Sequence, residues 1–159
     1  VGWAAVTAAG LVRFDPVAFT LLDYFDLEPG AGAYLGDARE IALVADHWLY
    51  LARVGDGLDL YQVAPWARLV HLASPRPFVT LDASPDQSWL VVNINASVPY
   101  GGVPGSTPQV YEAPGGLTLW YEYPVRLGKD TDAVRLHPDG KRFFVMAEYS
   151  VNVYLLRPR

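Results

Sequence analysis

The chain has 159 residues, enough to bury a hydrophobic core in one domain, and its 52% hydrophobic and 18% charged residues exclude an intrinsically disordered chain. The net charge of −5 argues against a phosphate-binding surface and so against a nucleic-acid partner, while the absence of cysteine excludes a disulfide scaffold, a thiolate metal site and a cysteine nucleophile. No apolar run approaches the ~18 residues that a membrane helix needs, so we expect no membrane insertion.

The first predicted strands lie in the acidic part of the chain. Three short apolar runs follow one another there: WAAVT from Trp3, GLVRFD from Gly10 and TLLDYFDL from Thr20. Four runs of the same kind come next: EIALVADH from Glu40, WLYLA from Trp48, GLDLYQ from Gly57 and ARLVHLAS from Ala67. The alternating aliphatic residues of GLDLYQ have the two-residue period of a strand with one buried face.

Two further series of runs each begin with a strand that ends in a proline-aspartate turn. One series comprises FVTLDASPDQ from Phe78, WLVVN from Trp89, GLTLWY from Gly116 and YPVRLG from Tyr123. The other comprises AVRLHPDG from Ala133, FFVMA from Phe143 and SVNVYL from Ser150. Pro85 and Pro138 fit the second position of a type I turn, with an aspartate next. We therefore predict a recurring unit of four consecutive strands, without a long amphipathic helix.

The strand with its Pro-Asp turn, the apolar run led by an aromatic residue and the Gly-Leu phrase together resemble the blades of β-propellers, particularly the YVTN and WD-repeat types. The resemblance covers nearly the whole chain as about three and a half blades. No Trp-Asp pair closes a blade and no Gly-His pair opens one, so the hydrogen-bonded tetrad of the WD type is not carried over. The resemblance implies an all-β, propeller-like array of four-stranded antiparallel blades, in which residues 1–159 form a single domain or part of a larger propeller. An antiparallel β-sandwich is the alternative fold.

Residues 95–115 are the largest interruption of this pattern. The segment is rich in proline and glycine, which excludes a helix and disfavours a strand, so we predict a loop inserted between the second and third strands of the third blade. The propeller resemblance implies that such loops lie on the face that commonly binds partners. A tolerated surface insertion is the alternative. The predicted partner-binding residues are Asn95, Tyr100, Gln109, Tyr111 and Glu112.

We predict no metal site, cofactor or catalytic residue in this chain. His47, His71 and His137 lie far apart in the sequence, unlike the compactly spaced ligands of zinc sites. The aspartates of the predicted turns are expected to stabilise those turns locally; they are Asp46, Asp86 and Asp139. A lactonase type of propeller would draw acidic and amide side chains into its central channel, where the resemblance places Asp82, Asp132, Asn93 and Asn95.

The resemblance implies a non-catalytic interaction or structural module that binds a protein or another partner through one face. The alternative is a fragment or subunit of a propeller hydrolase or lactonase-type enzyme, and the metal content of the purified protein distinguishes the two. The resemblance implies that an inner strand is missing before Trp3 and an outer strand after Tyr154. Because residues 1–60 are acidic and residues 129–159 are basic, we also expect a permanent protein partner or self-association into a homodimer or larger assembly.

Overall fold

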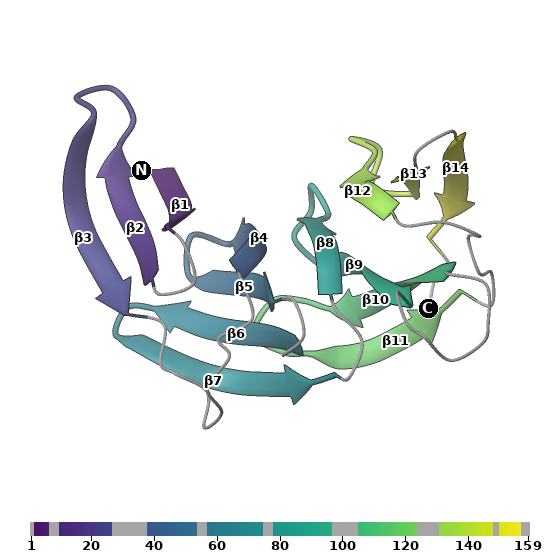
Figure 1. Ribbon diagram of the computed structural model, residues 1–159, viewed down its shortest axis with the longest axis horizontal. Helices are drawn as coiled ribbons and strands as arrows, with labels where there is room; N and C mark the ends of the chain where they lie inside the picture. Colours follow the sequence, from purple (N-terminus) through teal and green to yellow (C-terminus); the bar gives the residue numbers. More distant parts are fainter. Residues whose placement is uncertain are drawn as a thin grey trace.

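The computed structural model describes residues 2–6, 10–26, 38–53, 57–74, 78–96, 105–123, 131–147 and 150–156 (Figure 1). All fourteen elements in this part of the chain are β-strands, and they form four antiparallel sheets that follow one another in chain order. The predicted all-β class is confirmed, as several small antiparallel sheets. Within the same residues, no helix has the length and apolar character needed to cross a membrane.

Each sheet pairs every strand with the next strand along the chain. The first and fourth sheets have three strands each, with bounds β1 Gly2–Val6, β2 Gly10–Asp15, β3 Thr20–Asp26, β12 Thr131–Leu136, β13 Arg142–Ala147 and β14 Ser150–Leu155. The second sheet has the order β4-β5-β6-β7, with bounds β4 Ala38–Val44, β5 Trp48–Arg53, β6 Gly57–Val63 and β7 Trp66–Ala73. The third has the order β8-β9-β10-β11, with bounds β8 Phe78–Ala83, β9 Trp89–Ala96, β10 Gly105–Glu112 and β11 Thr118–Glu122.

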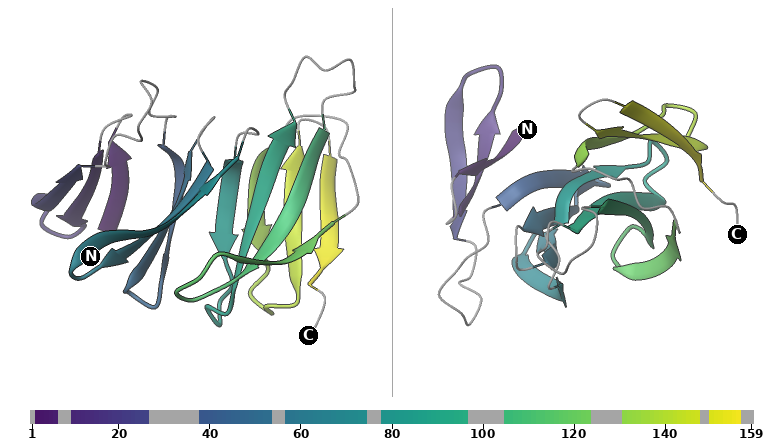
Figure 2. Two further views of the ribbon diagram at one scale, coloured as in Figure 1. Left: turned by 90° about the horizontal axis from the view of Figure 1, so that it is seen from below. Right: turned by 45° about the vertical axis from the view of Figure 1, so that its right-hand side comes forward.

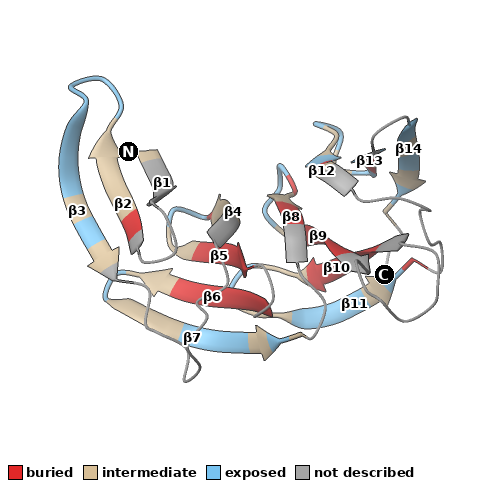
Figure 3. Ribbon diagram, in the orientation of Figure 1, coloured by how far each residue is buried: buried red, intermediate tan, exposed pale blue. Residues whose placement is uncertain are grey.

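The four sheets lie along an open arc, with the first and fourth sheets at its two ends (Figure 1, Figure 2). The strands that begin the last three sheets are neighbours, since β8 contacts both β4 and β12. Successive side chains of a strand point to opposite faces of its sheet, so a sheet with a neighbour on each side buries both faces. Figure 3 shows this burial in the middle strands of the second and third sheets.

Apolar side chains fill the three spaces between consecutive sheets. The space between the first and second sheets holds Leu11, Leu49, Leu51 and Tyr61. The space between the second and third sheets holds Tyr50, Leu58, Leu60, Leu90, Val92 and Tyr111. The space between the third and fourth sheets holds Val91, Val110, Tyr123, Val134, Phe143 and Val145. The core is therefore divided among the sheet interfaces.

The sheets share one pairing pattern, in which β2, β6, β10 and β14 are equivalent strands. In the last three sheets a tyrosine of this strand lies opposite an apolar residue of the preceding strand, in the pairs Leu49–Tyr61, Leu90–Tyr111 and Phe143–Tyr154. In the first three sheets the pairing with the outer strand shifts just before the equivalent aromatic residue, at Arg13/Phe14, Leu60/Tyr61 and Val110/Tyr111. Phe14 of the first sheet is thus the counterpart of the three tyrosines.

The predicted loop over residues 95–115 is wrong for much of its length. Residues 105–112 form β10, residues 95–96 end β9, and residues 97–104 lie outside the described residues. Pro108 has no N–H to donate, but in a strand the N–H and C=O of one residue point to the same side. The Pro108 C=O accepts from the Tyr123 N–H at 3.0 Å, and Tyr123 lies one residue beyond the end of β11. The N–H that Pro108 lacks would point to the same side, so its absence falls where the partner strand β11 has already ended.

This correction shifts the strands predicted for the third sheet. The phrase GLTLWY from Gly116 was expected as the third strand, but it supplies the outer strand β11. The run YPVRLG from Tyr123 was expected as the outer strand, and residues 124–128 of it lie outside the described residues. A sequence signal for the correct alignment exists, because YEAP from Tyr111 resembles YQVAP from Tyr61. Both phrases end in a cis Ala–Pro bond, at Pro114 and Pro65.

The turns between the first two strands of a sheet lie where the sequence predicts them. The Asp86 carboxylate accepts the Ser88 N–H at 3.1 Å, and the Asp139 carboxylate accepts the Lys141 N–H at 2.8 Å. The hydrogen bond from Lys141 is the main reason why the pKa of Asp139 is lowered to about 2. The predicted local role of these two aspartates is confirmed. Asp46 occupies the corresponding turn of the second sheet with a φ of 51°.

Candidate functional site

Two of the predicted partner-binding residues, Gln109 and Tyr111, have buried side chains on β10. The Tyr111 hydroxyl donates to Gln109 Oε1 at 2.6 Å, and Gln109 Nε2 donates to Glu122 Oε2 of β11 at 2.5 Å. Burial, followed by the nearby charge of Glu122, raises the pKa of Tyr111 to about 12. Tyr111 is 2% exposed and Gln109 is 8% exposed, so they offer little surface to a partner. The expectation that both lie on an exposed loop is corrected, because they belong to a strand paired on both sides.

The other three predicted residues do not gather around this pair. Glu112 is half-buried at the end of β10, opposite Trp89 of β9. Asn95 belongs to β9, but its side chain lies outside the described part of the chain, as does all of Tyr100. A binding role for this segment therefore stays a prediction.

The equivalent position in the second sheet holds a buried charged cluster, none of whose members is among the predicted site residues. Arg53 Nε donates to Asp59 Oδ2 at 2.5 Å, and Arg53 Nη2 donates to the Tyr61 hydroxyl at 3.0 Å. His71 Nδ1 lies 2.7 Å from Asp59 Oδ1. Burial alone would lower the pKa of Arg53, but Asp59 and Tyr61 raise it above its ordinary value. Paired charges of this kind offset much of each other's desolvation, so the cluster is a structural element of the sheet.

The sequence carried a signal for this cluster. Asp59 stands in the middle of GLDLYQ, between two leucines that are fully buried. A carboxylate in a buried strand requires a charged or hydrogen-bonding partner nearby. Arg53 supplies it from β5, which is adjacent both in sequence and in the sheet.

The three histidines occupy separate environments. His47 lies between β4 and β5 with its ring against Trp48, at a centroid distance of 4.7 Å. His71 belongs to the charged cluster, and His137 Nδ1 accepts the Asp139 N–H at 3.1 Å. Among the described residues, no three His, Cys, Asp or Glu side chains are grouped so that they could hold a metal ion.

A second polar cluster connects β4, β8 and β12, and we term it the inter-sheet polar cluster. Glu40 Oε2 accepts the Leu81 N–H at 2.9 Å and also the Thr80 hydroxyl. Glu40 Oε1 lies 2.9 Å from Arg135 Nη1. The carboxylate of the second sheet therefore reaches both following sheets. The cluster consists of Glu40, Thr80, Asp82 and Arg135.

The remaining members of this cluster also bond to backbone groups of the next sheet. Thr80 Oγ1 accepts the Val134 N–H at 3.0 Å, and Asp82 Oδ2 accepts the Leu136 N–H at 2.7 Å. Burial raises the pKa of Asp82 despite these hydrogen bonds. Asp82 thus lies on the first strand of its sheet and joins that sheet to the fourth. The side chain of Asp132, the other aspartate predicted near a channel, lies outside the described residues.

Asn93 is buried on β9, and neither of its side-chain polar atoms has a hydrogen-bond partner among the described residues. It pairs across the sheet with Thr80 of β8 and Pro108 of β10. Val91, two residues earlier on the same face of β9, belongs to the core shared with the fourth sheet. Asn93 therefore lies between the third and fourth sheets, where an unpaired amide is unfavourable.

One face of the fourth sheet is apolar and exposed. On β14 the side chains of Val151, Val153 and Leu155 are 61%, 56% and 68% exposed, and Met146 lies opposite Val151 on β13. Tyr154 points the other way, into the core shared with the third sheet. We term Met146, Val151, Val153 and Leu155 the C-terminal face.

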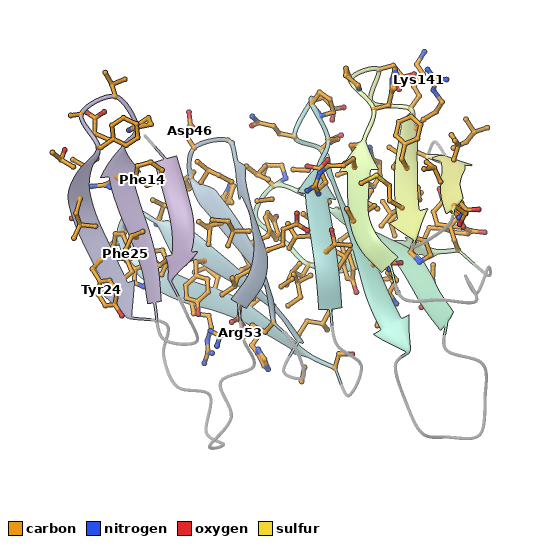
Figure 4. All side chains as sticks on the ribbon, turned by 45° about the horizontal axis from the view of Figure 1, so that its top comes forward. Phe14, Tyr24, Phe25, Asp46, Arg53 and Lys141 are labelled. Atoms are coloured by element: carbon orange, nitrogen blue, oxygen red, sulfur yellow. The ribbon has the colours of Figure 1, made fainter. Side chains whose placement is uncertain are left out.

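The outer face of the first sheet is apolar as well (Figure 4). Phe25 packs into the core shared with the second sheet and stacks on Trp66. Its neighbour Tyr24 belongs to the opposite face and is 51% exposed, and Leu21 is 65% exposed. In the strand pairing, Tyr24 lies opposite Val12 and Leu21 lies opposite Phe14. We term Val12, Phe14, Leu21 and Tyr24 the N-terminal face.

No family model matches the sequence, and no curated protein matches it. Solved structures do match the fold. A functionally unknown protein from Desulfotomaculum acetoxidans DSM 771 superposes with a TM-score of 0.69 at 12% identity, over 93% of this chain and 44% of that chain. A chain in the complex of KlAtg21 with the coiled-coil of AgAtg16 gives a TM-score of 0.68 at 11% identity, with the same two coverages. The likeness is one of fold, and this chain spans less than half the length of each match.

Proposed function

We propose that the four sheets are successive blades of a β-propeller-like array. The contacts of β8 with β4 and β12 support this arrangement, because inner strands of neighbouring blades adjoin around a common axis. The order of strands within each sheet, from first to outermost along the chain, is the order that blades require. The first sheet then lacks an inner strand, and the fourth lacks an outer one, among the described residues.

We infer that this array is a non-catalytic module that binds a protein. The polar side chains between its first strands are engaged in hydrogen bonds that join the sheets, which favours a structural role for them. The observation that carries the proposal is the C-terminal face, where three large apolar side chains of one strand are more than half exposed. Contiguous exposed apolar surface of this kind is typical of protein-binding sites. A matched structure is itself a complex with a coiled-coil.

Site-specific photocrosslinking tests this function. Because the sequence contains no cysteine, a benzophenone maleimide can be attached at a single Val153→Cys position. Leu69→Cys is the matched control, since Leu69 is 45% exposed on the outer strand β7, away from the C-terminal face. We expect irradiation in an extract of the producing cells to yield one product of defined mass, a second copy or another protein, at position 153 and none at position 69.

Charge on the face provides the specificity control for this experiment. Val151→Arg in the Val153→Cys background should abolish the product, because a buried guanidinium without a partner is unfavourable at an apolar interface. A product that persists with Val151→Arg, or that forms equally at position 69, would contradict a binding role for the C-terminal face. Stoichiometric calcium or zinc after dialysis, together with lactone hydrolysis, would favour a propeller enzyme instead.

A further inference from the structure

We propose that the C-terminal face binds the N-terminal face of a second copy of this chain, head to tail. The inference rests on the proposed blade arrangement, and it names the partner of the protein-binding face. It follows from how the internal sheet interfaces are built, from the register of the two exposed faces, and from their charges.

The three internal interfaces each join the same two kinds of face. One sheet contributes aliphatic residues of its strand β2, β6 or β10, namely Leu11, Leu58, Leu60 and Val110. The next sheet contributes the tyrosine of its own equivalent strand, namely Tyr61, Tyr111 and Tyr154. The chain therefore uses one recurring mode of packing between consecutive sheets.

The C-terminal face is of the first, aliphatic kind. Counted from the equivalent tyrosine of each strand, Val151 and Val153 of β14 stand at the positions that Leu58 and Leu60 occupy on β6. The two leucines are 0% exposed, because the third sheet covers them. The two valines are more than half exposed because no sheet of the described residues follows the fourth. This face has the composition of an interior interface.

The N-terminal face is of the second, aromatic kind. Phe14 stands at the position of the interface tyrosines, and its pairing with the outer strand shifts as it does next to Tyr61 and Tyr111. Leu21 and Tyr24 of β3 extend this surface beside it. The two ends of one chain thus carry the two halves of the interface that the chain forms three times internally.

Charge favours a second copy as the occupant. The described residues of the first sheet include one arginine and three aspartates, whereas those of the fourth include three basic residues and two aspartates. The two sheets therefore attract each other electrostatically at neutral pH.

A contact between two different faces is heterologous, and it closes into a ring when the rotation per copy permits. The open arc of the four sheets, with the two faces at its ends, suits closure by two copies (Figure 1). Each copy would then cover both of its exposed apolar faces.

Light scattering on purified protein, with one charge placed on either face, tests the proposal. At about 10 μM the unmodified chain should have the mass of a dimer or a closed oligomer. Val153→Asp on the C-terminal face and Tyr24→Asp on the N-terminal face should each weaken association by about 100-fold, because each buries an unpaired carboxylate. Leu69→Asp is the matched control and should associate like the unmodified chain. If Val153→Asp does not melt cooperatively, Val151→Asp on the same face takes its place. Leu21→Asp takes the place of Tyr24→Asp in the same way.

Mixing the two variants identifies the faces in contact. Each variant retains one intact face, and the two intact faces are complementary, so an equimolar mixture should recover a dimer through one contact. A mixture that stays monomeric, or a Tyr24→Asp variant that associates normally, would overturn head-to-tail contact. An unmodified chain that is monomeric at all concentrations would overturn self-association. Capture of a different protein at position 153 would still support the proposed binding function in that case.

Discussion

Several buried polar side chains bond to a polar side chain on the same or a neighbouring strand, and Asn93 departs from that pattern. Tyr111 bonds to Gln109, and Gln109 bonds to Glu122. In the described part of the chain, Asn93 has no such partner for its side-chain oxygen or nitrogen. A buried amide without hydrogen bonds loses its solvation and gains nothing in return.

Replacing this amide by an apolar group of similar size should therefore stabilise the fold. We expect Asn93→Val to raise the free energy of unfolding by about 1–2 kcal/mol in urea titrations. The matched control is Asn152→Val, since the Asn152 amide is only half-buried and donates to Ser150 Oγ at 3.2 Å. The control should change stability by less than about 0.5 kcal/mol. A destabilised Asn93→Val variant would indicate that the amide is hydrogen-bonded in solution.

The ionisation of Tyr111 predicts a specific loss of stability in alkaline solution. Its folded-state pKa of about 12 lies above the ordinary value of 10.0, so folding favours the protonated hydroxyl. That contribution is complete below pH 10 and is lost as the pH rises from 10 towards about 12. Unfolding free energies measured across this window should fall less steeply for Tyr111→Phe than for the unmodified chain. Equal slopes for the two proteins would refute the assignment.

At the scale of the element, equivalent strands differ in burial because only some of them have a neighbouring sheet on each side. Leu60 of β6 is 0% exposed, whereas Leu155 of β14 is 68% exposed. The same truncation at the two sites therefore probes the neighbouring sheet. We expect Leu60→Ala to lower the free energy of unfolding by about 2–4 kcal/mol and Leu155→Ala by less than about 0.5 kcal/mol. Chemical denaturation at concentrations where the chain is monomeric provides the comparison, and similar losses at both sites would contradict the described packing.

Strand β6 of the second sheet could be predicted from the sequence because its apolar residues alternate with polar ones, with glycine at its start and proline in the turn after it. Strand β10 could not, since Pro108 and the neighbouring glycines are typical of loops. Its formation depends on where the partner strand β11 ends, which is a property of the whole sheet. The Gly-Leu phrase from Gly116 resembles the third strand of the second sheet, GLDLYQ, more closely than TPQVYE from Thr107 does. It was therefore assigned to the third strand of the third sheet, although it forms the outer strand.

The candidate site was predictable only where its contacts are local. The charged cluster of the second sheet lies on adjacent strands, so the isolated Asp59 within GLDLYQ could have indicated it. The inter-sheet polar cluster joins Glu40 to residues 80 and 135, which are distant in sequence and meet only through the stacking of three sheets. No local pattern of residues determines that stacking, and the exposed faces at the two ends follow from it as well.

At the scale of the whole molecule, the four sheets pack against one another in one recurring way. The first and fourth sheets, at the ends of the arc, each expose one of the two kinds of face that this packing joins. The same residue types that fill the interior, aliphatic on one side and aromatic on the other, are therefore exposed in the first and fourth sheets. Covering them removes apolar surface from water, which is the main favourable contribution to association between proteins. The proposed assembly would thus use the same kind of contact as the fold.

Chemical crosslinking between two single-cysteine variants measures whether these two faces meet. Val153→Cys and Tyr24→Cys proteins, mixed in equal amounts and treated with a short bis-maleimide, should form a covalent heterodimer in high yield. Val153→Cys alone and its mixture with Leu69→Cys should form little product. A heterodimer yield no greater than that of the Leu69→Cys mixture would contradict head-to-tail packing of the sheets.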